Sequence, residues 1–199
     1  MKMLIRIALT VVLVVVVSAC GGGDSGSGGS GGGLTAVTNA DSADTVVRWM
    51  SDGVIEGGLF NSLPLGTHNQ YSVNGGLGGT ATVTGKDTYT TASSSSCVSS
   101  TRIADLTTVV FDNYKVMSSD NVEATITGTV TFYYYYYSQQ CSGGYSSNKS
   151  VSISGDSVQV RFVVDGTSGY QDTISFGASG TSSMLLHGSC TAGGTTYYF

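Results

Sequence analysis

The sequence predicts a mainly β domain: an antiparallel meander that closes as a sandwich, a barrel or a curved half-barrel, with one N-terminal helix packed on it. After Pro64, apolar and tyrosine side chains alternate with threonine and serine, which indicates strands with one buried and one solvated face. Gly, Asn and Asp separate these runs at short intervals, and short connections join antiparallel neighbours. Residues 42–54 instead repeat an apolar side chain every fourth position, which is typical of a helix.

The first element, residues 1–19, is expected to be an export signal. Two cations, Lys2 and Arg6, precede an apolar run that ends in small residues, and this order is typical of a signal peptide. About eleven apolar residues are too few for a spanning helix, which needs about 20. The run is therefore a poor permanent membrane segment.

The motif Val17-Ser18-Ala19-Cys20 resembles the lipobox of bacterial lipoprotein signal peptides. The resemblance implies a diacylglyceryl group on the Cys20 thiol, cleavage before Cys20 and acylation, such as palmitate, of the new amino terminus. Two or three acyl chains, at about 0.8 kcal/mol per buried methylene, would give a stable lipid anchor to the membrane. The alternative is a cleaved secretory signal followed by an ordinary cysteine.

Residues 20–33 comprise the lipid-attachment cysteine and a tether. Positions 21–33 contain only Gly, Ser and one Asp, so they are expected to behave as a flexible coil that reaches about 20 Å. In lipoproteins of Gram-negative bacteria, Asp directly after the lipidated cysteine favours the inner membrane. Gly21 stands there, so the resemblance points to the outer membrane of a bacterial cell envelope.

Residues 34–199 are predicted to form a single β-rich domain, since this length suits one core. After removal of residues 1–19, six Lys and Arg face thirteen Asp and Glu, a formal charge of −7. An acidic domain has no electrostatic reason to bind nucleic acid or anionic lipid.

The helix is expected to begin after Ser42, which can cap its amides, and to end near Gly53 or Gly57. Val46, Met50 and Val54 form its apolar stripe, and the sheet must cover this stripe. Trp49, the only tryptophan, is predicted to anchor the helix on the sheet.

The alternation predicts ten strands, separated by turns such as 85–87 and 155–156. They are expected at residues 69–73, 80–84, 88–92, 106–117, 122–137, 150–154, 158–164, 172–176, 183–187 and 195–199.

Five consecutive tyrosines end the clearest strand. Alternation places Tyr133, Tyr135 and Tyr137 on its threonine-rich face and the other two on the core face. Exposed rings at i and i+2 lie about 6.6 Å apart and could stack successive sugar rings or contact a partner's apolar side chains. The alternative is that tyrosine is a strong strand former whose hydroxyl keeps an exposed ring soluble. This alternative is preferred, because burial of alternate rings needs no ligand.

Residues 71–85, 110–114 and 126–132, which are rich in Gly and Thr, resemble the β-repeats of many uncharacterised proteobacterial lipoproteins. That resemblance implies a location and a style of fold, and no activity. The terminal stretch from Gly194 to Phe199 resembles the carboxyl-terminal signal of outer-membrane β-barrels, a further alternative. The acyl anchor, the tether and strands shorter than 9–11 residues argue against it.

Catalytic chemistry has no recognisable motif here. His68 and His187 are isolated, with no spacing typical of a zinc site, and no Gly-x-Ser-x-Gly elbow occurs. We therefore expect no catalytic residue, metal or cofactor. The preferred function is a lipid-anchored binding or structural module with a carbohydrate, lipid or envelope-protein partner; the alternatives are a half-barrel lipid carrier and an enzyme with a scattered site.

A disulfide is expected, because export places the domain where thiols oxidise. If residues 106–117 and 122–132 form a hairpin that turns about residues 118–121, opposed residue numbers sum to about 239. Cys97 and Cys141 sum to 238, so they are predicted to pair. Cys190 is a competitor without such a register match.

Overall fold

The structure, a computed structural model, describes residues 34–117, 121–164, 166, 169–181 and 186–199. They lie within one compact unit of the chain, Gly33–Phe199. The predicted signal, Cys20 and the tether lie outside the described residues. In the part that is described, no helix has the length and apolar character needed to cross a membrane.

One helical segment precedes the strands: α1 (Ala40–Arg48) continues through a π-helix, η1 (Trp49–Leu59), into the short α2 (Phe60–Ser62). Asn39, not Ser42, caps it. The Asn39 side chain accepts a hydrogen bond of 2.9 Å from the Ser42 amide, and the Ser42 hydroxyl accepts one from the Asn39 amide. This reciprocal pair satisfies two amides that the first turn leaves free.

The glycines do not end the helix as predicted. It runs past Gly53, Gly57 and Gly58 to Ser62. A Cβ atom at Gly58 would lie 2.9 Å from Cγ1 of Val116 on the sheet. Glycine therefore serves here to bring the helix backbone close to the sheet, and not to terminate the helix.

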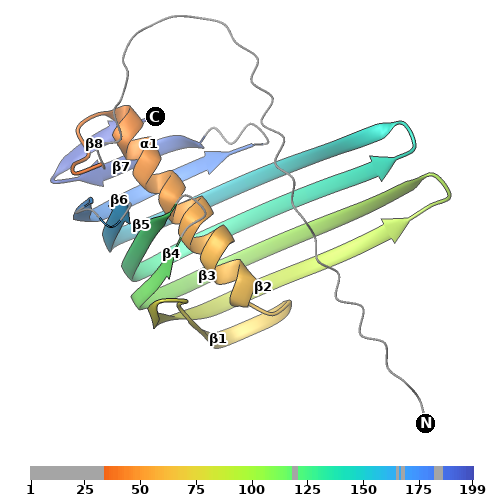
Figure 1. The fold of residues 1–199 in the computed structure, drawn as a ribbon, viewed down its shortest axis with the longest axis horizontal. Helices are drawn as coiled ribbons and strands as arrows, with labels where there is room; N and C mark the ends of the chain where they lie inside the picture. The colour runs from red at the N-terminus through yellow and green to blue at the C-terminus, as the bar shows by residue number, and fades with distance from the viewer. Residues whose placement is uncertain (1–33, 118–120, 165, 167–168, 182–185) are drawn as a thin grey trace, which may run out of the picture. The chain divides into compact units, whose positions relative to one another are not determined.

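Eight strands follow, and they form one antiparallel sheet in the order β1-β2-β3-β4-β5-β6-β7-β8. The predicted meander with one packed helix is confirmed, but the sheet does not close on itself into a sandwich or a barrel (Figure 1). The strands are β1 (Gly66–Asn74), β2 (Gly78–Ser93), β3 (Cys97–Met117), β4 (Val122–Cys141), β5 (Gly144–Val164), β6 (Gln171–Gly180), β7 (Leu186–Ala192) and β8 (Thr195–Tyr198).

Two of the predicted turns are irregularities inside long strands, which is why ten predicted strands become eight. Gly85 lies within β2 at a register shift and has a φ of 147°. Gly155 lies within β5 beside a second shift. Both are bulges, in which an extra residue bends the strand without breaking the pairing.

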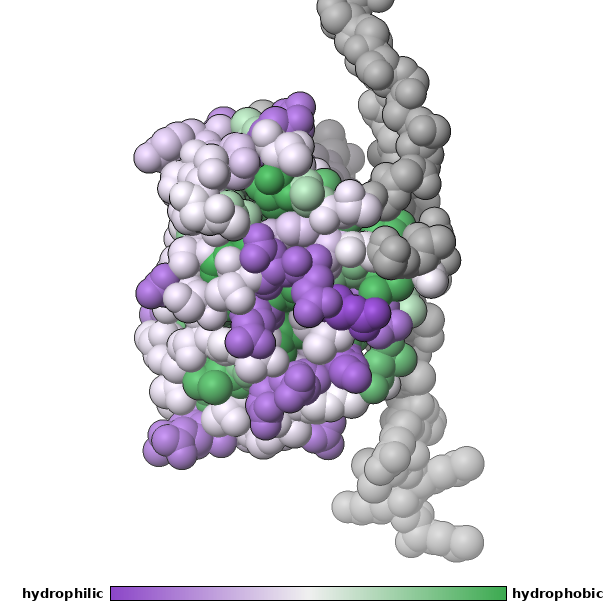
Figure 2. All heavy atoms as spheres, turned by 90° about the vertical axis from the view of Figure 1, so that its left-hand side faces the viewer, coloured by the Kyte–Doolittle hydropathy of each residue, from purple (hydrophilic) through white to green (hydrophobic). Residues whose placement is uncertain are grey.

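The helix packs on one face of the sheet, here called the inner face; the opposite face is the outer face. The hydrophobic core lies between the helix and the inner face. Trp49 contributes as predicted, its ring 5.2 Å from that of Phe162, and Phe60 packs edge-on against Phe132 at 5.6 Å. Seen from one end of the strands, the surface is largely white and purple, with hydrophobic residues in separate small areas (Figure 2). The burial of one face by one helix thus explains the alternation in the sequence.

Candidate functional site

The three predicted tyrosines share the outer face of β4. Tyr133, Tyr135 and Tyr137 pair across the ladder with Asp105, Ile103 and Thr101 of β3. Tyr133 is 39% exposed, and the other two are partly exposed. Their spacing along one strand gives a row of rings on an open face, which we call the tyrosine strip.

The intervening tyrosines belong to the inner face, as alternation predicted. Tyr134 packs edge-on against Phe60 at 5.5 Å and stacks on Tyr136 at 6.4 Å. Burial, with the nearby Glu56 carboxylate, raises the pKa of Tyr134 well above its usual range. Tyr136 shares a hydrogen bond of 2.6 Å with the Tyr145 hydroxyl. These two rings hold β4 in place and leave the strip to face solvent.

The tyrosine strip continues from a charged neighbour into a part of the sheet without charge: Tyr133 lies opposite Asp105, whereas Tyr135 and Tyr137 lie opposite Ile103 and Thr101. Residues 88–101 and 133–148, which form the far ends of β2 to β5, contain no Asp, Glu, Lys, Arg or His. Figure 1 shows these ends extending past the helix. We call this region the uncharged arm. A surface rich in hydroxyl groups and aromatic rings matches hydroxylated ligands such as sugars.

The disulfide fixes the end of this arm. Cys97 and Cys141 are paired neighbours in β3 and β4, their α-carbons lie 4.1 Å apart, and a disulfide joins them, as the predicted register required. Cys190 is a free cysteine buried on β7. Burial raises the pKa of its thiol to about 11.

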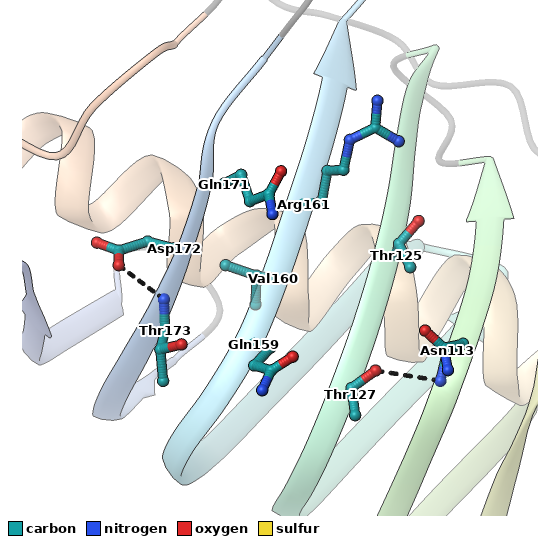
Figure 3. A pocket seen from close by; sticks show the side chains of 9 residues that line it. All are labelled: Asn113, Thr125, Thr127, Gln159, Val160, Arg161, Gln171, Asp172 and Thr173. Carbon is teal, nitrogen blue, oxygen red and sulfur yellow. Dashed lines mark hydrogen bonds between the residues drawn. The ribbon is translucent and has the colours of Figure 1, made fainter.

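A hollow of about 580 Å³ opens at the other end of the outer face. Its lining is mainly amide and hydroxyl groups from β3 to β6, with one guanidinium and one carboxylate (Figure 3). The lining residues are Asn113, Thr125, Thr127, Gln159, Val160, Arg161, Gln171, Asp172 and Thr173. In Figure 3 the helix lies behind the sheet, so this hollow faces away from the core.

The hollow was not predicted as a site, although part of its signal was in the sequence. Alternation along residues 158–164 places Gln159 and Arg161 on the solvated face of β5. A bulge in β3 then brings Asn113 beside Thr127, whose hydroxyl accepts a hydrogen bond of 3.1 Å from the Asn113 amide. No sequence pattern fixes that bulge, so the assembled hollow could not be predicted.

Two ion pairs on the inner face are also beyond the sequence prediction. Asp87 is fully buried and accepts two hydrogen bonds from Arg102, of 2.6 and 3.1 Å. The Arg102 guanidinium also lies 4.3 Å from the centre of the Phe60 ring. Lys149 contacts Glu56 of the helix at 2.9 Å, and burial raises the pKa of that carboxyl despite this partner. The Lys149–Glu56 pair joins the sheet to the helix, and the Asp87–Arg102 pair joins β2 to β3. In both pairs the charged groups are bound to each other.

Neither histidine contributes to the hollow. His68 is buried, its ring 5.3 Å from that of Tyr71, while His187 is exposed on β7. Within the described ranges, no group of three or more His, Cys, Asp or Glu side chains could hold a metal ion.

No protein-family model matches the chain, and neither the curated proteins nor the solved structures contain a match to it. The candidate site therefore consists of the tyrosine strip and the outer-face hollow, argued from their chemistry alone.

Proposed function

We propose that this chain is a lipoprotein of the bacterial cell envelope, anchored through Cys20 to the outer membrane, and that its domain binds polysaccharide along the outer face. The lipobox supports the anchor, and the Gly and Ser tether would allow the domain to stand off the bilayer. The tyrosine strip on the uncharged arm is the observation that carries the binding function.

The geometry favours a polymer of sugar rings. Tyr133, Tyr135 and Tyr137 repeat along one strand at about 6.6 Å, and aromatic faces stack on the apolar faces of rings. Serines of β5 pair with the strip, Ser152 opposite Tyr133 and Ser150 opposite Tyr135. Their hydroxyls supply donors and acceptors for sugar hydroxyls.

The alternatives have less support. A lipid carrier needs an apolar cavity under the sheet, and helix side chains fill that position in the described domain. An enzyme has less support because, among the described residues, the polar groups that converge at the outer-face hollow include no histidine or cysteine. His68 is buried against Tyr71, and the charged pairs of the inner face are bound to each other.

The test replaces the strip and compares it with tyrosines on the opposite face. Tyr133→Thr/Tyr135→Thr/Tyr137→Thr should lower polysaccharide affinity at least about tenfold, because each stacked ring contributes about 0.5–1.5 kcal/mol. Tyr89→Thr/Tyr145→Thr is the matched control, since these rings are 49% and 60% exposed on the inner face of the same arm.

Affinity electrophoresis in gels that contain dextran or alginate provides the measurement, with urea denaturation to check folding. The proposal is supported if the gel retains the unchanged protein and the control variant but does not retain the triple variant. Equal losses in both variants, or no retention of the unchanged protein, would refute it.

A further inference from the structure

The cations of the domain divide by face. Residues 34–199 contain six Lys and Arg. The three on the helix or the inner face are all paired: Arg48 with Asp44 at 2.7 Å, Arg102 with Asp87 at 2.6 Å, and Lys149 with Glu56 at 2.9 Å.

The other three, Lys86, Lys115 and Arg161, lie on the outer face, where their cross-strand neighbours Asp105, Thr125 and Gln171 also lie. Among the described residues, none of these three side chains takes part in an ion pair or a hydrogen bond. The outer face therefore carries positive charge that the fold itself does not use.

Two of these cations lie on either side of Thr125, a lining residue of the hollow: Arg161 lines the hollow itself, and Lys115 lies next to it without lining it. Thr125 of β4 pairs with Arg161 of β5 on one side and with Lys115 of β3 on the other. The two cationic residues are thus two strand spacings apart, about 10 Å at the backbone. Gln171 of β6 continues the same row beyond Arg161. Both long side chains can reach a single anionic group held over Thr125.

The nearby carboxylates of the described residues form no ion pair with these two cations, although each keeps its negative charge. Asp172, which lines the hollow, accepts hydrogen bonds from the Thr173 amide at 2.7 Å and the Tyr170 hydroxyl at 3.3 Å. Asp112 accepts one from the Asn113 side chain at 3.1 Å. Glu123 shares the outer face two residues before Thr125, but within the described structure it forms no ion pair with either cation.

Hollows follow β4 from this cationic pair toward the tyrosine strip. A second one, of about 370 Å³, is lined by Thr129 and Thr131 of β4 and by Ser154, Gly155 and Asp156 of β5. The Asp156 carboxylate accepts a hydrogen bond of 2.6 Å from Ser175. From Thr125 to Tyr133 the strand covers about 26 Å at about 3.3 Å per residue, which is long enough for several sugar rings.

We propose that the hollow at Thr125 binds the carboxylate of an acidic polysaccharide whose chain continues along β4 to the tyrosine strip. This inference rests on the proposed function and names its ligand class. The guanidinium and the ammonium donate charge-assisted hydrogen bonds to the carboxylate, and Thr125, Gln159 and Gln171 bind neighbouring sugar hydroxyls. An acidic domain repels a polyanion at long range, so the two free cations determine where an acidic chain can bind.

The experiment compares a polyuronate, alginate, with the neutral glucan dextran. Arg161→Gln and Lys115→Gln should each weaken alginate binding about tenfold, the effect of one lost charge-assisted bond, and leave dextran binding unchanged. Lys86→Gln is the matched control: it removes an outer-face cation whose cross-strand neighbour is Asp105 and not Thr125, and it should change alginate binding less than twofold. Raising the salt from about 0.05 to 0.5 M should weaken binding of alginate and not of dextran.

Each outcome separates this inference from the proposed function. The carboxylate site is overturned if the protein binds alginate and dextran equally, or if Lys86→Gln weakens alginate binding as much as Arg161→Gln does. The proposed binding at the tyrosine strip still stands in that case, provided that the triple tyrosine variant loses binding of both polymers. If the protein binds phosphatidylglycerol vesicles more tightly than alginate, and Arg161→Gln reverses that order, the hollow binds a lipid phosphate. This outcome also overturns the inference. Binding of neither polymer by the unchanged protein overturns both proposals.

Discussion

Removal of the disulfide tests how the uncharged arm is stabilised. Cys97 and Cys141 are 44 positions apart in the sequence and lie opposite each other at the end of the β3–β4 ladder. In the chain-entropy model, a loop of this length restricts the unfolded chain by about 4 kcal/mol at 25 °C. Both cysteines are only partly buried, and no core contact depends on them. The whole effect should therefore come from the unfolded state.

Cys97→Ser/Cys141→Ser should keep the fold but lose about 4 kcal/mol of unfolding free energy. For a domain of this size, that loss lowers the melting temperature by about 10 °C. Urea denaturation at equilibrium measures the free energy, and far-ultraviolet circular dichroism checks the fold. In the folded protein Cys190 is buried, and burial raises the pKa of its thiol, so it does not compete for exchange there.

Reductant supplies the control: it should destabilise the unchanged protein as much as the double substitution does, and it should leave the double variant unaffected. A loss below about 1 kcal/mol would refute the reasoning, since it would mean that the unfolded chain is already restricted without the disulfide.

Two further predictions concern the inner face and the anchor. Asp87→Ala leaves the Arg102 guanidinium without its partner beside Phe60, so it should lower the free energy of unfolding by about 3 kcal/mol, as measured by urea denaturation. This is at the low end for buried pairs, because the Arg102 side chain is 26% exposed. Asp87→Leu/Arg102→Met should lower it less, and a larger loss in the double variant would contradict the prediction. Cys20→Ala should leave an unprocessed precursor in whole cells, seen as a larger band on immunoblots; normal maturation of that variant would exclude the lipid anchor.

The disulfide shows how far register can be argued from sequence. Counting outward from one turn predicted a sum of 239 for opposed residues. In the structure the sum is 240 near the turn, where Met117 lies opposite Glu123, and 238 at Cys97 and Cys141. Two bulges in β3 account for the change. The prediction was right because the shift was small, and sequence alone did not contain the bulges.

The helix boundary was predicted less well, for a related reason. Gly57 and Gly58 are typical helix ends when only neighbouring residues are considered. Contact with Val116 of β3, a residue far along the chain, gives Gly58 a packing role instead. Local preference is outweighed wherever a long-range contact supplies more free energy.

The sequence by itself determined the elements that depend on neighbouring residues: the meander, the buried and solvated faces, the placement of the tyrosine strip and the separation of its rings. Tertiary structure alone decided that the sheet stays open and that Lys115 and Arg161 flank Thr125. The physical reason is that alternation reports which face a side chain occupies, while pairing between distant strands, with its bulges, decides which side chains of that face become neighbours.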